Sequence, residues 1–175
     1  IDEILVAVGI DAMELSDIDG RMTHNQGCHI WQELVSRSGD PSIGLSLIKF
    51  AKPATYDVMG YIGNVSTNVG EALTRGVQYS KILHTGASLT FETDTKNARV
   101  TYTLVEPLQP MPMAYNEWVI ATILHMFRLN TGVDCEPLKA VFKHPKPKNM
   151  DPYHSFFRCP IIFNQPTNEI IFNLD

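Results

Sequence analysis

Histidine and cysteine side chains are the residues of this sequence best suited to metal chemistry. His24 and Cys28 are four residues apart, a spacing that places both on one face of a helix, and His29 follows directly. His144 and His154 flank a proline-rich segment. Neither group has further ligands at a spacing typical of a zinc site. Ordinary helix and loop residues are therefore the favoured interpretation, and we expect no metal.

His125 is a lone histidine in an otherwise apolar predicted helix, where it could ligate haem iron and make the protein a gas sensor. Glu117 and Arg128 fall beside it on the helical wheel, so a solvated polar stripe explains it better. The sequence contains no G-x-S-x-G, Walker loop, dinucleotide-binding glycine fingerprint, H-E-x-x-H or C-x-x-C. A small hydrolase with an unrecognised site remains a third possibility. We expect neither an enzyme nor a cofactor.

GYIGNV, residues 60–65, is the segment that comes nearest to a phosphate-binding loop. It has only two glycines, and we predict that it lies between two helices, which makes it a weak candidate.

Composition indicates one folded domain over residues 1–175. The chain has 44% hydrophobic and 19% charged residues, which is a globular composition. A net charge of −5 gives no general attraction to phosphate, so we expect no nucleic-acid or membrane binding by this domain itself. The three cysteines are odd in number and irregularly spaced, which favours free thiols in a reducing compartment.

Apolar periodicity predicts helices over residues 4–8, 25–38 and 41–50, the last introduced by Asp40 and Pro41. Another helix is predicted to run to Leu83 from a cap at Ser66 or Thr67. Two alternating runs over 88–105 predict a β-hairpin. A helix over 115–131 is predicted to end at Gly132.

The closing segment predicts a strand over 138–142, a short helix capped by Asp151, and a second hairpin formed by CPIIF and EIIF. The element order is therefore helices-ββ-α-β-α-ββ. This order predicts an α+β fold in which a helical N-terminal part packs on an antiparallel or mixed sheet.

Small residues facing aromatic ones suggest a ligand site. Gly76, Tyr79 and Ser80 lie on the predicted helix that precedes the first hairpin. Phe91 and Tyr102 lie on the inward face of that hairpin and would form the walls of an apolar pocket for a small molecule. The alternative is a filled core with no space between these five residues.

Trp118, Thr122 and Leu129 form a second apolar strip on the helix over 115–131, outside its main apolar arc. Apolar strips rimmed by polar groups often mark interfaces, so these residues predict a two-fold dimer contact. The alternative is that the N-terminal helices cover Trp118 and Leu129 within one chain.

FKHPKPKNMDPYHSFFRCPIIFNQPTNEIIF, residues 142–172, resembles the closing segment of the N-terminal, arabinose-binding-like domain of a subgroup of AraC-type transcriptional regulators. SGDPSIGLSL and GYIGNVSTNVGEALTRGVQYSKIL are similar to earlier segments of the same domain, in the same order. The cupin of the arabinose regulator is β-rich, whereas the pattern here is helix-rich, so we expect an α+β domain that is not a cupin. The resemblance implies a cytoplasmic bacterial regulator that senses an unidentified small-molecule effector, forms homodimers, and binds promoter DNA only through a C-terminal helix-turn-helix domain.

Overall fold

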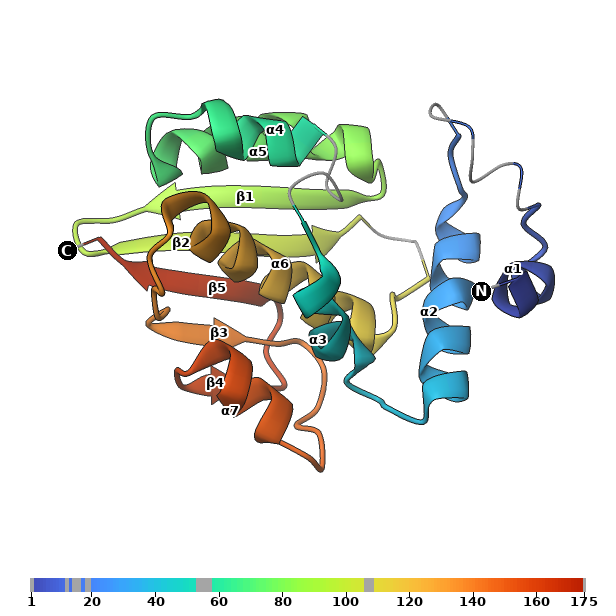
Figure 1. Cartoon of the computed structure of the whole chain (residues 1–175). Helices are drawn as coiled ribbons and strands as arrows, with labels where there is room; N and C mark the ends of the chain where they lie inside the picture. The colour runs from blue at the N-terminus through green and yellow to red at the C-terminus, as the bar shows by residue number, and fades with distance from the viewer. Residues whose placement is uncertain are drawn as a thin grey trace.

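One mixed sheet of five strands crosses the middle of the molecule (Figure 1). The computed structural model describes residues 2–11, 13, 17, 20–52, 58–105 and 109–174. Its strands, in the spatial order β1-β2-β5-β3-β4, are β1 (Ala87–Thr93), β2 (Asn97–Leu104), β5 (Asn168–Asn173), β3 (Lys139–Val141) and β4 (Ile161–Ile162). The first four pair antiparallel in turn, and β4 pairs parallel with β3. The predicted α+β class is confirmed.

The first hairpin joins β1 and β2 and is confirmed. Leu89 lies opposite Tyr102 and Phe91 lies opposite Val100, so these four residues share one face of the sheet. In the turn, the Asp94 carboxylate accepts hydrogen bonds from two backbone N–H groups, those of residues 96 and 97. Asp therefore closes this turn through its own side chain.

Helices cover the sheet and extend beyond it (Figure 1). Their bounds are α1 (Asp2–Val8), α2 (His24–Ser38), α3 (Ile43–Leu47), the 3₁₀ helix η2 (Ile48–Phe50), α4 (Val58–Val65), α5 (Val69–Leu83), α6 (Met113–Thr131) and α7 (Asp151–Phe157). Helix α6 lies across the sheet, α5 packs beside β1, and α1 and α2 stand to one side. The helices predicted over 4–8 and 25–38 and the helix ending at Gly132 are confirmed, with Gly132 at a φ of 67°. The helix predicted over 41–50 is divided into α3 and η2. It begins at Ile43, with Ser42 and not Asp40 at the N-cap position.

The start of α5 differs from the predicted one. GYIGNV belongs to α4, so the expectation that it lies between helices is wrong. The cap of α5 is Asn68, whose side chain accepts a hydrogen bond from the Glu71 N–H, and not Ser66 or Thr67. Thr67 instead donates its N–H to the Glu71 carboxylate. Because Asn caps as well as Ser or Thr, side-chain type alone did not distinguish these neighbouring positions.

The predicted second hairpin is wrong, because β4 and β5 lie on opposite sides of β3. After β4 the chain turns at Asn164, which has a φ of 58°, and the Gln165 N–H donates to the Phe142 carbonyl. The chain therefore crosses the end of β3 before β5 begins. Helix α7 starts at Asp151 itself, with Met150 at the N-cap position and no side-chain cap. The expectation that Asp151 caps this helix is also wrong.

Gly44 brings α3 against the first turn of α6. A Cβ atom at this position would lie 1.9 Å from the carbonyl oxygen of Ala114. Real Cβ atoms do not approach a backbone oxygen so closely, so only glycine allows this helix contact. The glycine of SGDPSIGLSL thus has a packing reason.

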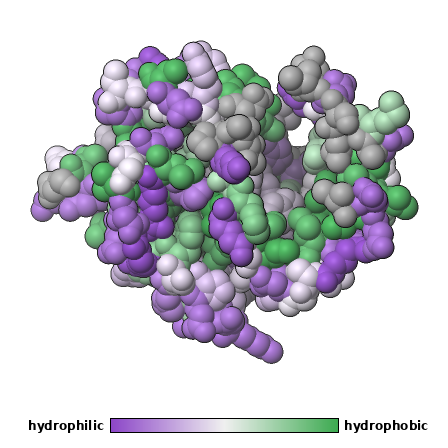
Figure 2. Space-filling model, in the orientation of Figure 1, coloured by the Kyte–Doolittle hydropathy of each residue, from purple (hydrophilic) through white to green (hydrophobic). Residues whose placement is uncertain are grey.

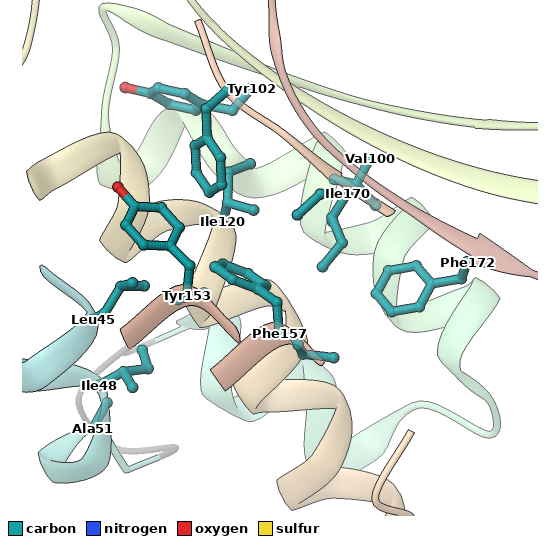
Figure 3. Close-up of a cluster of buried hydrophobic side chains, with 14 of the residues drawn as sticks. Leu45, Ile48, Ala51, Val100, Tyr102, Ile120, Tyr153, Phe157, Ile170 and Phe172 are labelled. Atoms are coloured by element: carbon teal, nitrogen blue, oxygen red, sulfur yellow. The ribbon is translucent and has the colours of Figure 1, made fainter. Parts of the chain in front are cut away.

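The core surrounds Ile120 on α6 (Figure 3). Side chains from α3, η2, α7 and two strands meet there, namely Leu45, Ile48, Tyr153, Phe157, Val100 and Ile170. With only seven residues, α7 would not be stable alone. Its Tyr153 and Phe157 are fully buried, and each contributes about 2 kcal/mol by removing apolar surface from water. Tertiary packing therefore holds this helix.

The predicted solvated stripe on α6 is wrong at Glu117, which is fully buried. The Tyr153 hydroxyl donates a hydrogen bond to the Glu117 carboxyl group. Burial raises the pKa of Glu117 to about 7 despite that bond. His144 Nε2 lies 3.9 Å from the same carboxyl group, and burial lowers the pKa of His144. The two groups are therefore a neutral pair over mildly acidic pH, and not a salt bridge.

The other two members of that stripe are also engaged with the protein. His125 Nε2 donates to the Ala51 carbonyl over 3.1 Å. Arg128 donates to the carbonyls of Cys135 and Phe156 and lies over the Phe156 ring. His125 and Arg128 thus bind backbone carbonyls of other segments, and Glu117 binds the Tyr153 side chain, so the three residues tie α6 to its neighbours.

Replacing Glu117 by Gln should change how stability depends on pH. The ordinary pKa of Glu is near 4.5, and the folded value is about 7. Between these values the folded state binds more protons than the unfolded state, so the contribution of Glu117 is full below pH 4.5 and is lost as pH rises through 7. Relative to Glu117→Gln, the parent chain should lose about 3 kcal/mol of unfolding free energy between pH 4.5 and 8. Urea titrations across this range measure the difference.

Glu92→Gln, on an exposed position of β1, controls for the loss of one formal charge. If the difference in unfolding free energy between the parent and Glu117→Gln stayed constant with pH, the assignment of Glu117 as a buried, protonated acid would be wrong.

Candidate functional site

A cavity of about 360 Å³ lies between α4, α5, the first hairpin and α6. This volume falls within the range of small-molecule sites. Its wall consists mostly of apolar side chains: Met59, Ile62, Gly63, Ala72, Leu73, Gly76, Val77, Ser80, Leu83, His84, Ala87, Leu89, Val100, Tyr102, Tyr115, Trp118, Val119, Thr122, Ile123, Met126, Phe127 and Asn130. The described part of the chain therefore contains an apolar cavity with a few polar groups, the usual composition of such a site.

Helix α6 supplies the largest part of this wall. The contributing residues recur every three or four positions, as one face of a helix requires: Tyr115, Trp118, Val119, Thr122, Ile123 and Met126. The residues that alternate with them, including Glu117 and Leu124, are fully buried on the other side. Helix α6 therefore separates the cavity from the main core.

The cavity exists because several of the α4 and α5 residues that face it are small. A Cβ atom at Gly76 would lie 3.0 Å from the terminal carbon of Met59, and one at Gly63 would lie 2.2 Å from the Asn130 amide nitrogen. Ser80 is buried and donates its hydroxyl to the Val77 carbonyl over 2.8 Å. Larger residues at these positions would fill the space or push α4 away from α6.

The structure brings together three of the five residues predicted to bind a ligand. Gly76, Ser80 and Tyr102 line the cavity. Tyr79 is 42% exposed on the outer side of α5, and Phe91 packs against the core farther along β1, so neither is part of the lining. The helical period explains why Tyr79 lies outside the cavity. It precedes Ser80 by one residue and therefore points about 100° away from it. That these residues bind an effector stays a prediction.

Trp118 and Thr122 also line the cavity, although the sequence suggested an exposed strip with Leu129. The Trp118 ring lies 5.9 Å from that of Trp31 on α2. Leu129 is 45% exposed and lies apart from the cavity wall. The three residues therefore do not form one strip, and their role in a dimer stays a prediction.

The Tyr102 hydroxyl is a completely enclosed polar atom, and its side chain is 3% exposed. Burial raises its pKa, as does the side chain of Tyr115, which lies beside it in a hydrogen-bonding contact of poor geometry. The two rings lie 6.1 Å apart. Because the oxygen is enclosed, a molecule in the cavity meets the ring of Tyr102 and not its hydroxyl.

Tyr102 also borders a second hollow of about 510 Å³ on its other side. The amide side chains of that hollow are already paired, since Asn168 binds the Lys143 N–H and Asn116.

His84 was not predicted as a site residue, yet it lines the cavity at the end of α5. Its Nε2 lies 3.2 Å from His24 Nδ1, and its Nδ1 lies 3.5 Å from the Tyr115 hydroxyl. His24 Nε2 donates to the Gln109 carbonyl over 2.7 Å, so a neutral His24 accepts from His84 through Nδ1. Burial and the neighbouring His24 lower the pKa of His84. The chain of bonds links α2 to the cavity wall, 60 residues away in sequence.

His24 and Cys28 do lie together, with 3.5 Å between Nε2 and Sγ. Cys28 is fully buried against the Met111 sulfur, and burial raises the pKa of its thiol, so it is a poor nucleophile. Among the residues that the structure describes, no three His, Cys, Asp or Glu side chains are grouped so that they could hold a metal ion. His125, proposed as an alternative haem ligand, is not part of the cavity wall.

Comparison with known proteins identifies the family. The model of the arabinose-binding domain found at the N-terminus of AraC transcription regulators matches residues 1–175. The chain belongs to this family. It is 23% identical over 128 residues to the ornithine utilization regulator of Pseudomonas aeruginosa, a match that covers 73% of this chain and 38% of that protein. The family assignment agrees with the resemblance seen in the closing segment.

The fold is also similar to that of a solved regulator. The crystal structure of the transcriptional regulator CdpR from Pseudomonas aeruginosa matches with a TM-score of 0.60 and 16% sequence identity. The match covers 98% of this chain and 52% of that one, so the chain spans about half or less of the relatives it resembles. None of the described helices is both long and apolar enough to cross a membrane.

Proposed function

We propose that this domain senses a small-molecule effector for an AraC-type transcriptional regulator, and that the cavity between α5 and α6 is the effector site. The observation that carries the proposal is the apolar cavity with a few polar groups in its wall, in a domain of a regulator family. Ligand sites are typically such partly formed apolar spaces with a few polar groups. Gly76, Ser80 and Tyr102 are the members of the sequence-predicted set that would contact the effector.

The domain has no catalytic role in this proposal. Its named relatives are transcriptional regulators, and the buried Cys28–His24 contact lacks an accessible nucleophile. Binding energy would instead favour one arrangement of the walls over another, since a ligand shifts a conformational equilibrium only by its difference in affinity for the two states.

Filling the cavity should abolish effector binding without unfolding the domain. Ala72 on α5 lines the cavity, so Ala72→Phe would place a ring in its space. In a thermal-shift screen of small molecules, a compound at a hundred times its Kd should stabilise the parent chain by about 2.7 kcal/mol and leave Ala72→Phe unaffected. Thr74→Phe, an exposed position on the same helix, should respond like the parent.

Val119→Phe places a ring in the same cavity from α6 and serves if Ala72→Phe does not fold. Compounds that stabilise both filled variants as strongly as the parent would show that the effector site lies elsewhere.

We propose that promoter DNA is bound by a part of the regulator outside residues 1–175, in the cytoplasm of a bacterial cell. The net charge of −5 supports this, because an acidic domain gains little from releasing counterions from DNA. Residues 1–175 alone should give no sequence-selective gel shift at physiological salt and submicromolar protein. A selective shift at that concentration would contradict the proposal.

We further propose that the domain forms a two-fold homodimer that includes Leu129. Leu129 and Val133 at the end of α6 are 45% and 59% exposed. Figure 2 shows that hydrophobic residues reach the surface on the face it displays. A two-fold contact would cover such residues with their own copies. Two-fold dimers are the commonest closed assembly of soluble chains.

Leu129→Glu should convert this dimer to a monomer, because two buried carboxylates would face each other across the axis. Light scattering should give twice the chain mass for the parent and a single mass for Leu129→Glu, with unchanged circular dichroism. Leu138→Glu introduces the same change at an equally exposed leucine before β3 and should remain dimeric. A parent of single mass, or a dimeric Leu129→Glu, would refute this interface.

A further inference from the structure

The described residues of the cavity wall carry no formal charge at neutral pH. Of the described residues that surround it, none is Asp, Glu, Lys or Arg. Its titratable groups are His84, Tyr102 and Tyr115. Burial lowers the pKa of His84 and raises the pKa of both tyrosines, so all three are neutral at pH 8. An ion that entered would lose its hydration and gain no opposite charge.

The hydrogen-bonding groups of the wall are largely paired within the protein. The Ser80 hydroxyl binds the Val77 carbonyl, and His84 lies between His24 and Tyr115. The Tyr102 hydroxyl is enclosed and lies beside Tyr115, so it is not available to a ligand. A ligand with many polar groups would therefore leave most of them unpaired, at a cost for each.

We infer that the effector is an uncharged, mainly apolar molecule. This inference rests on the proposed function, since it takes the cavity as the effector site. A cavity of about 360 Å³ suits on the order of ten to twenty non-hydrogen atoms. Arabinose and ornithine, which appear in the names of the family and of one relative, carry several hydroxyl or charged groups and do not fit this wall.

Three nine-carbon probes test the inference at pH 8: 2-nonanone is neutral, nonanoate is anionic and nonylammonium is cationic. Trp118 lines the cavity, and Trp31 is the only other tryptophan of the sequence, so Trp31→Phe leaves Trp118 as the reporter of binding. 2-Nonanone should change Trp118 fluorescence saturably, and both ions should bind at least about ten-fold more weakly. Equal binding of either ion, or no binding of 2-nonanone, overturns the inference.

Ala72→Phe distinguishes failure of this inference from failure of the proposed function. If nonanoate, arabinose or ornithine binds and Ala72→Phe abolishes that binding, the cavity remains the effector site and the ligand class is wrong. If 2-nonanone binds equally well to Ala72→Phe and to the parent, the cavity is not the site, and both proposals fail.

Discussion

The hydrogen bond from Tyr153 to the buried Glu117 is the contact around which the domain is organised. It joins α7 to α6 at a point from which water is excluded, and it satisfies one oxygen of a carboxyl group that burial keeps protonated into the neutral range. The other oxygen has no partner among the described residues, and the nearby His144 is itself held neutral by burial. A buried carboxyl group with one unpaired oxygen lowers stability unless the surrounding side chains are well fixed. Close packing of α3 against α6 at Gly44 and the burial of Phe157 supply that rigidity.

Helix α6 both anchors the core and lines the cavity, because its two sides face different environments. One side carries Glu117 and Leu124 into the main core, where packing is complete. The opposite side carries Trp118 and Ile123 into a space that α4 and α5 only partly fill. Since α6 is anchored firmly on the core side, a molecule in the cavity would act mainly on α4 and α5, which meet fewer elements. A fixed wall opposite a less constrained one suits a sensor, because only the second needs to move.

The His24–His84 contact extends the cavity wall to the N-terminal helices. His84 touches the cavity and Tyr115, while His24 is the first residue of α2 and binds the Gln109 carbonyl just before α6. Facing ring nitrogens can share one proton, whereas two protons would repel each other across 3.2 Å. A displacement of α5 would therefore move His84 and change its contact with His24 on α2. This provides a physical contact between the proposed effector site and a helix that stands beside the sheet (Figure 1).

Local patterns in the sequence were sufficient for the element types, the α+β class and the family resemblance. The alternation of residues 88–105 determined a hairpin, and glycine at 132 ended α6, because both depend on neighbouring residues alone. Three of the five predicted site residues also line one cavity, since small residues on a helix next to an aromatic strand leave space wherever they meet. The helical wheel placed Glu117 in water, because a wheel cannot show that α7, 36 residues away, covers that side with Tyr153. Nor could periodicity show that β5 would insert between β2 and β3, or that His84 would meet His24. Pairing between distant segments is decided by how the layers pack, and that information exists only in the tertiary structure.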